Sequence, residues 1–265
     1  MIYKLDYILN HLSNCIENKS PFSIVRIGDG DLKIIRLALK KNYHEEKFRQ
    51  QGLPKNDKIF NKILTIYKEA CQGADYISNF DVYFLKEYLW KRSVCEKTLR
   101  QMINWKDIYT KIGITNEDYC SPEIGFYFFL SQRKNLFSLM KNLNVCLVNC
   151  FPNVDASLNK MGYNTTMFQI PGRNQNHYSK YKNNLKILRQ MARKYDLFLI
   201  GGGMLGRGYS NIIKRNGGIC VDIGQVFDVW HNKKVPPRLK GLVKYNQENM
   251  MFSLTEKGKL YEGAI

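Results

Sequence analysis

The chain has 265 residues, of which 44% are hydrophobic and 24% are charged, and its formal net charge is +18. This balance is typical of a soluble globular protein, and no apolar run approaches the ~20 residues that a membrane-spanning helix needs. The positive charge indicates anionic partners, such as nucleotide phosphates or anionic lipid, but no nucleic-acid-binding module accompanies it, so we expect no specific nucleic-acid partner.

The first half of the chain starts with helical periodicity and one clear strand. The N-terminus lacks the basic and apolar segments of a signal peptide, and the seven scattered cysteines suit reduced thiols, so we expect a cytoplasmic protein. Apolar residues alternate over 22–27, which predicts a strand. Helical periodicity is found at 3–17, 32–39, 58–72 and 82–100. The polar stretch 42–57 looks like a surface excursion, and we expect a helical insertion around 40–140 within a single domain spanning 1–265.

The second half of the chain alternates strands with helices. Apolar runs predict strands at 144–150, 165–170, 196–200 and 219–222. The helices predicted between them lie at 154–161, 178–195 and 209–215. Strict alternation of this kind predicts an α/β fold, with a mostly parallel, Rossmann-like sheet and helices on both of its faces.

Two carboxylates lie one residue apart where the first strand ends, in the sequence Gly28-Asp29-Gly30-Asp31. Open α/β sheets bind their ligands at the carboxyl ends of the strands, and carboxylate oxygens there suit Mg²⁺ or Mn²⁺ bridged to a diphosphate. One hypothesis is therefore a metal site formed by Asp29 and Asp31. The alternative is local structure only, with Asp31 as the N-cap of the next helix and Asp29 in a turn.

A glycine-rich loop forms a second candidate site. The residues from Gly201 to Gly206 fit the pattern G-x-G-x-x-G after a strand, and Asp222 ends the next strand. This context is typical of dinucleotide binding, so an NAD- or S-adenosyl-methionine-binding enzyme is one alternative, and close helix–strand packing through small residues is another. Arg173 follows the strand 165–170 and could reach a phosphate, although an arginine in a loop is by default only exposed to solvent.

Three stretches together resemble the GT-D class of bacterial glycosyltransferases. Arg26-Ile-Gly-Asp-Gly-Asp31 resembles the family's Arg-Phe-Gly-Asp-Gly-Glu, and the loop 201–208 stands where the family has a short loop of small residues. The segment 218–230 is similar to the family's Asp-Ile-Gly-His segment and the acidic and aromatic residues after it. Two positions differ, because Asp31 stands where the family has glutamate and Gln225 where it has histidine.

This resemblance implies a metal-dependent glycosyltransferase of the hexosyltransferase class. It would move a sugar from a nucleotide-diphosphate donor, with a UDP-sugar favoured, to a hydroxyl acceptor. Asp29 and Asp31 would hold Mn²⁺ or Mg²⁺, and the catalytic candidates are Asp31, Asp222 and Asp228, of which Asp222 or Asp228 would take the acceptor proton. We expect the donor to contact Arg26, Gly28, Asp29, Gly30, Arg173, Gly201, Gly202, Gly203 and Gln225. Because Gln225 cannot act as a base, a catalytically silent nucleotide-sugar-binding protein is a further alternative.

The acceptor implied by the resemblance is a glycan, glycoprotein or lipid-linked molecule used in cell-surface polysaccharide synthesis. A basic cluster at 233–244, just past the third matching segment, would suit an acceptor that carries phosphate or lies at the anionic inner face of a membrane. We also expect the three matching stretches to form the walls of one cleft.

Overall fold

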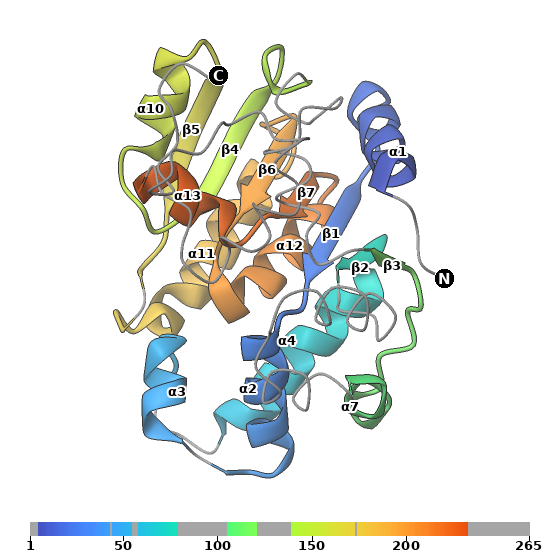
Figure 1. Ribbon diagram of the computed structural model, residues 1–265, viewed down its shortest axis with the longest axis vertical. Coiled ribbons are helices and arrows are strands. Elements are labelled where there is room, and N and C mark those ends of the chain that lie inside the picture. The colour runs from blue at the N-terminus through green and yellow to red at the C-terminus, as the bar shows by residue number, and fades with distance from the viewer. Residues whose placement is uncertain are drawn as a thin grey trace, which may run out of the picture.

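The computed structural model describes residues 5–42, 44–54, 58–78, 105–120, 139–172 and 174–232. Within these ranges seven parallel strands form one sheet with the order β3-β2-β1-β7-β6-β4-β5 (Figure 1). The strands are β1 (Phe22–Arg26), β2 (Tyr76–Ser78), β3 (Tyr119–Cys120), β4 (Asn144–Asn149), β5 (Asn164–Gln169), β6 (Leu197–Ile200) and β7 (Ile219–Asp222). The predicted parallel α/β fold is therefore confirmed.

Helices cover both faces of this sheet, as expected. They are α1 (Leu5–Glu17), α2 (Asp29–Leu39), α3 (Glu45–Gln50), α4 (Ile59–Gly73), α7 (Trp105–Ile112), α10 (Val154–Lys160), α11 (His177–Met191), α12 (Gly206–Arg215) and α13 (Val226–Asn232). One apolar layer joins the sheet to α1, α10 and α13, and a second joins it to the other helices. None of the helices within the described ranges is both long and apolar enough to cross a membrane.

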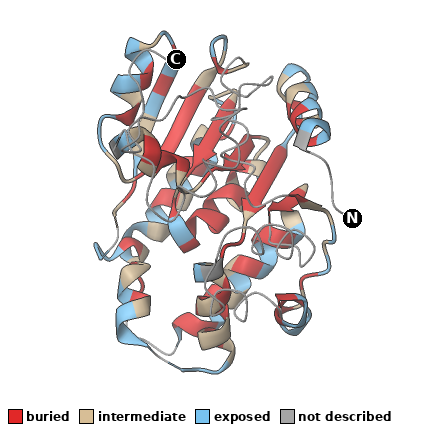
Figure 2. Cartoon of the chain, viewed as in Figure 1, coloured by how far each residue is buried: buried red, intermediate tan, exposed pale blue. Residues whose placement is uncertain are grey.

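The strands supply side chains to both apolar layers because successive residues of a strand point to opposite faces. In β1, Ile24 belongs to the layer with α1, α10 and α13, whereas Val25 belongs to the layer with α2 and α4. Figure 2 shows the result, with the inner strands mostly buried between helices whose outer surfaces are exposed, while the edge strand β5 is largely exposed. Burial on both faces explains why these strands are nearly continuous apolar runs.

The predicted surface excursion at 42–57 is tied to the core through its described residues 44–54. Phe48, in α3, is fully buried, and the Gly52 carbonyl accepts a hydrogen bond at 3.0 Å from the backbone N–H of Tyr178 in α11. The short strands β2 and β3 lie in the region where the sequence predicts a helical insertion, and the sequence patterns did not predict them. The predicted helix at 82–100 lies outside the described residues.

The strand order brings together the chain segments that resemble the glycosyltransferase motifs. β7 pairs with β1 on one side and with β6 on the other, with Ile24 opposite Val221 and Ile200 opposite Asp222. The carboxyl ends of these three strands lie side by side, as the expected site requires, and the single cleft stays a prediction. The chain leaves β1 and β6 toward α2 and α12 on one face and leaves β7 toward α13 on the other. Such divergence at adjacent strand ends is where open α/β sheets bind ligands.

Candidate functional site

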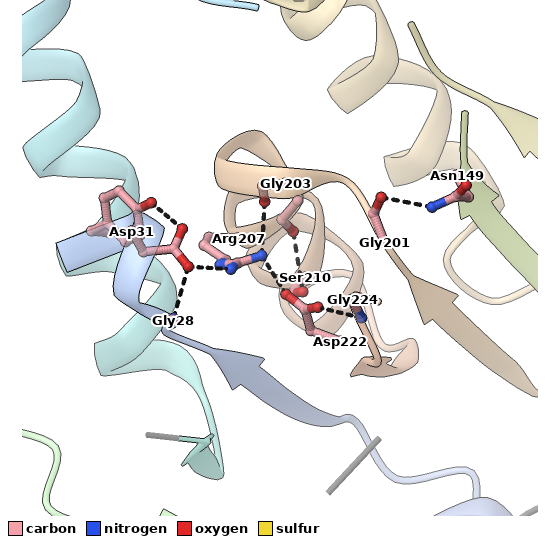
Figure 3. A network of polar contacts seen from close by, with 11 residues as sticks. Gly28, Asp31, Asn149, Gly201, Gly203, Arg207, Ser210, Asp222 and Gly224 are labelled. Carbon is pink, nitrogen blue, oxygen red and sulfur yellow. Dashed lines mark hydrogen bonds and ion pairs between the residues drawn. The ribbon is translucent and has the colours of Figure 1, made fainter. Parts of the chain in front are cut away.

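The candidate site is built around a buried arginine that contacts two carboxylates (Figure 3). Arg207 lies in the first turn of α12, and its Nη2 donates to Asp31 Oδ2 at 2.7 Å. Its Nη1 donates to Asp222 Oδ2 at 2.6 Å and to the Gly203 carbonyl at 2.7 Å. Arg207 is 3% exposed and Asp222 is 0% exposed. One guanidinium therefore joins α12 to the end of β7 and to the start of α2.

Asp31 is fixed from three directions. Besides Arg207, the backbone N–H of Gly28 donates to Asp31 Oδ2 at 2.8 Å, and the Tyr67 hydroxyl of α4 donates to Oδ1. The N-cap of α2 is Gly28, and Asp31 is the third helical residue, whose carboxylate accepts the N-cap N–H as in a capping box. The interpretation of Asp31 as the N-cap itself is therefore wrong, although its carboxylate does cap the helix.

Asp222 is fully buried, and both of its carboxylate oxygens accept hydrogen bonds from the protein. Its Oδ1 accepts a hydrogen bond at 3.1 Å from the Gly224 N–H, and its Oδ2 is held by Arg207. Burial raises the pKa of Asp222, and the charges of Arg207 and Arg26 oppose this effect. For Arg207, burial lowers the pKa, but attraction to Asp222 and Asp31 outweighs it and leaves the pKa raised. The guanidinium of Arg207 therefore carries its positive charge beside the two acids.

A second arginine lies against the same strand ends. Arg26 is the last residue of β1 and is partly buried, and its guanidinium lies beside the Cα atoms of Gly28 and Gly224. A Cβ at Gly224 would stand 2.9 Å from Arg26 Cζ, and Gly224 also has a left-handed φ of +48°. The left-handed φ favours glycine at this position, where glycine also leaves room for the Arg26 guanidinium. Two arginines and two aspartates therefore lie together at the ends of β1 and β7.

The glycine loop is closely packed. A Cβ at Gly201 would collide with the side chains of Asn149 and Phe227, and a Cβ at Gly202 would stand 2.9 Å from the Gly206 Cα. Asn149, at the end of β4, also donates to the Gly201 carbonyl at 2.7 Å. These close contacts explain why the loop has glycine at these positions, and the explanation needs no bound ligand.

The site geometry favours this packing explanation over dinucleotide binding. A dinucleotide fingerprint needs an acid that is free to bind ribose, whereas Asp222 is fully buried and paired with Arg207. The two residues before Gly206, Met204 and Leu205, are also buried, and the side chain of Arg207 folds back over the first turn of α12 to the Gly203 carbonyl. The N-terminus of this helix is thus occupied by the protein itself.

The sequence-predicted residues fall into two groups. The structure gathers Arg26, Gly28, Gly30, Asp31, Gly201, Gly202, Gly203, Asp222 and Gln225 at or next to the carboxyl ends of β1, β6 and β7. Asp228 lies in α13 and is partly buried. The Asp29 side chain, Arg173 and the basic cluster 233–244 lie outside the described part of the structure. The functional roles of all these residues remain predictions.

Sequence reasoning missed Arg207 and Tyr67. One signal for Arg207 was present, because a basic residue in the first turn of a helix is opposed by the helix dipole and needs a compensating partner. Nothing in the local sequence identifies Tyr67, which lies on the apolar face of α4.

The two described acids do not fit a site that binds a divalent metal directly. A carboxylate has about four acceptor positions. Asp31 uses three of them for Gly28, Tyr67 and Arg207, and its side chain is 10% exposed, while Asp222 is fully buried. Arg207 already places a positive charge against both carboxylates, and that charge would repel a cation. Within the described ranges, no group of three or more acidic, histidine or cysteine side chains could hold a metal ion. Mn²⁺ or Mg²⁺ dependence thus remains a prediction from the sequence.

A buried network of hydrogen bonds connects helix α12 to helix α11. The Tyr209 hydroxyl lies 2.7 Å from His177 Nε2 and accepts a hydrogen bond at 2.9 Å from Asn184 Nδ2. His177 and Asn184 belong to α11, and Tyr209 belongs to α12. Burial lowers the pKa of His177 to about 4, so His177 is neutral near pH 7. This network fixes the helix that carries Arg207.

Comparison with known proteins identifies the fold. No protein-family model matches the chain, and a search of curated proteins finds no significant match. Two solved structures match with 14% sequence identity over 89% of this chain and 84% of theirs. One, with a TM-score of 0.56, is a selenomethionine-substituted domain of unknown function 1792. The other, with a TM-score of 0.55, is described as the highly conserved domain of unknown function 1792, which has a distinct glycosyltransferase fold. This chain shares that fold.

We predict that Gly202→Ala destabilises the protein by roughly 1–3 kcal/mol, because the new methyl group meets helix backbone that cannot move aside. Gly30→Ala is the matched control, since a Cβ there meets no atom within 4 Å and alanine favours the helix. Urea unfolding without nucleotide measures both. Equal stability of the two variants would contradict the packing explanation.

We also predict that stability falls as the pH is lowered from 6.5 to about 4. In this window the unfolded chain binds a proton at His177 that the folded protein does not bind, so the contribution is complete above pH 6.5 and is lost below it. The expected loss at pH 5 is about 2 kcal/mol. Urea unfolding at pH 7.5 and pH 5 should show a smaller difference for His177→Gln than for the parent. The exposed His44→Gln is the control, and an unchanged difference in His177→Gln would refute the assignment.

Proposed function

We propose that this protein is a glycosyltransferase that binds a nucleotide-sugar donor where β1, β6 and β7 end. The observation that carries the proposal is that the fold and a sequence motif point to the same class of enzyme. The chain has a fold shared with a structure described as a glycosyltransferase fold, and its stretch 26–31 resembles the GT-D motif at the end of β1. The diverging strand ends at this edge are the expected ligand position for such a sheet.

Arg26 is the described cation best suited to meet the donor's diphosphate. It ends β1 and is partly buried, with glycine on two sides. In a partly dry site, a fixed guanidinium stabilises the charge that develops on a leaving diphosphate more strongly than it would in water. Arg207 is less suited, because it is 3% exposed, whereas Arg26 is only partly buried.

Asp228 is better placed than Asp222 to take the proton from an acceptor hydroxyl. Asp222 is fully buried and paired with Arg207, whereas Asp228 lies in the first turn of α13 and is partly exposed. A general base must come within hydrogen-bonding distance of the acceptor. We therefore assign the base to Asp228 and a structural role to Asp222.

The finer features of the reaction are part of the proposal. We expect a UDP-sugar as donor and a hydroxyl on a bacterial glycan, glycoprotein or lipid-linked molecule as acceptor. The basic charge of the chain suits an acceptor that carries phosphate or lies at an anionic membrane face. Mn²⁺ or Mg²⁺ dependence is to be tested with the donor, and no step is assigned to a metal, because the described acids do not fit one.

The test is a thermal-shift and calorimetric screen of UDP-sugars and other nucleotide sugars, beside NAD and S-adenosyl-methionine, with and without Mn²⁺. A ligand that binds only the folded state raises the melting temperature. We predict that a nucleotide sugar does so, and that Arg26→Gln weakens its binding at least about 10-fold, as expected for losing a charge-assisted hydrogen bond.

Arg49→Gln is the matched control, because Arg49 is an exposed arginine on α3. Equal affinity in Arg26→Gln and Arg49→Gln would remove Arg26 from the donor site. Stabilisation by NAD or S-adenosyl-methionine alone would contradict the proposal, and donor binding without sugar transfer would identify a catalytically silent binding protein.

A further inference from the structure

Arg207 occupies the position between two acids where a cation is required. Asp31 and Asp222 come from different elements, α2 and β7, yet each places its Oδ2 within 2.7 Å of the same guanidinium. Two carboxylates this close in a buried region repel each other and cannot both stay ionised without a positive charge between them. In many proteins a divalent metal ion supplies that charge.

The guanidinium is held in place by more than the two acids. Nη1 also donates to the Gly203 carbonyl at 2.7 Å, and Arg207 comes from a helix supported by α11. The side chain is buried, so no water competes for its hydrogen bonds. The cation is thus a permanent part of the protein.

The remaining hydrogen bonds of the acids complete this arrangement. Asp31 also accepts from Gly28 and Tyr67, and Asp222 also accepts from Gly224. These donors belong to the fold itself and leave Asp31 and Asp222 little capacity to bind a metal ion. An arginine is suited to the position because its planar fork can contact two carboxylates at once.

We propose that Arg207 is a built-in replacement for a divalent cation at Asp31 and Asp222, so that these two acids bind no metal while the guanidinium is present. Arg207 acts through the two acids as a positioning residue and contacts neither donor nor acceptor. The inference rests on the proposed function in one respect. If the protein binds a nucleotide-sugar donor, any metal dependence of that binding does not arise from Asp31 or Asp222.

The experiment uses metal alone, without nucleotide. Thermal unfolding of the parent, Arg207→Met and Arg207→Lys is followed with and without millimolar Mn²⁺. We expect Mn²⁺ to raise the melting temperature of Arg207→Met by a few degrees, because the two acids then need a cation. The rise should disappear when Asp31→Asn is added. Arg207→Lys should show no such rise, because its ammonium group keeps the positive charge.

A folded Arg207→Met that gains no Mn²⁺ stabilisation would overturn the inference. Paramagnetic resonance of Mn²⁺ titrated into the parent, Asp31→Asn and Asp222→Asn keeps it testable even if Arg207→Met does not fold. We expect the three to bind the same amount of Mn²⁺, and a loss of bound Mn²⁺ in either variant would overturn the inference. Because no nucleotide is present, these outcomes leave the proposed function untouched, and failed donor binding would leave the inference untouched.

Discussion

One buried cation shared by two carboxylates is the interaction on which the functional end of this protein depends. Arg207 is the link between the start of α2, the end of β7 and the first turn of α12. Taking three charges out of water costs several kcal/mol for each ion unless their geometry and hydrogen bonds compensate. Here Asp31 and Asp222 also accept hydrogen bonds from neighbouring groups, which offset the cost of burying their charges. These bonds hold the start of α2 and the end of β7 in place.

Glycines make this arrangement sterically feasible. Gly202 lets the loop backbone approach the start of α12, and Gly224 leaves space for the guanidinium of Arg26. The same residues that look like a dinucleotide fingerprint in the sequence are thus required by close packing, and the acid that would have bound ribose, Asp222, is bound to Arg207 instead. The remaining candidate for ligand binding is the β1 end, where Arg26 and the fixed carboxylate of Asp31 both lie near Gly28.

The sequence predicts the sheet better than it predicts the charge network. Strands β4, β6 and β7 are buried, mostly apolar runs of six, four and four residues, so their pattern is visible locally. The strands β2 and β3 have three and two residues, too few to show a pattern, and only pairing with their neighbours defines them. The contact of Arg207 with Asp31 joins residues 176 positions apart, a pairing that no local pattern encodes. The acids could be predicted because they follow strands, whereas their partner could not.

The most direct test of this account measures the free energy of unfolding of four proteins. These are the parent, Arg207→Met, the double variant Asp31→Asn/Asp222→Asn, and the triple variant. Removing the cation alone leaves two buried carboxylates without a positive charge. This should lower the free energy of unfolding by about 3–5 kcal/mol. If Arg207 supplies the positive charge that both acids need, the triple variant should be more stable than Arg207→Met, because it no longer buries carboxylates without a cation. A triple variant whose loss equals the sum of the two separate losses would contradict the account.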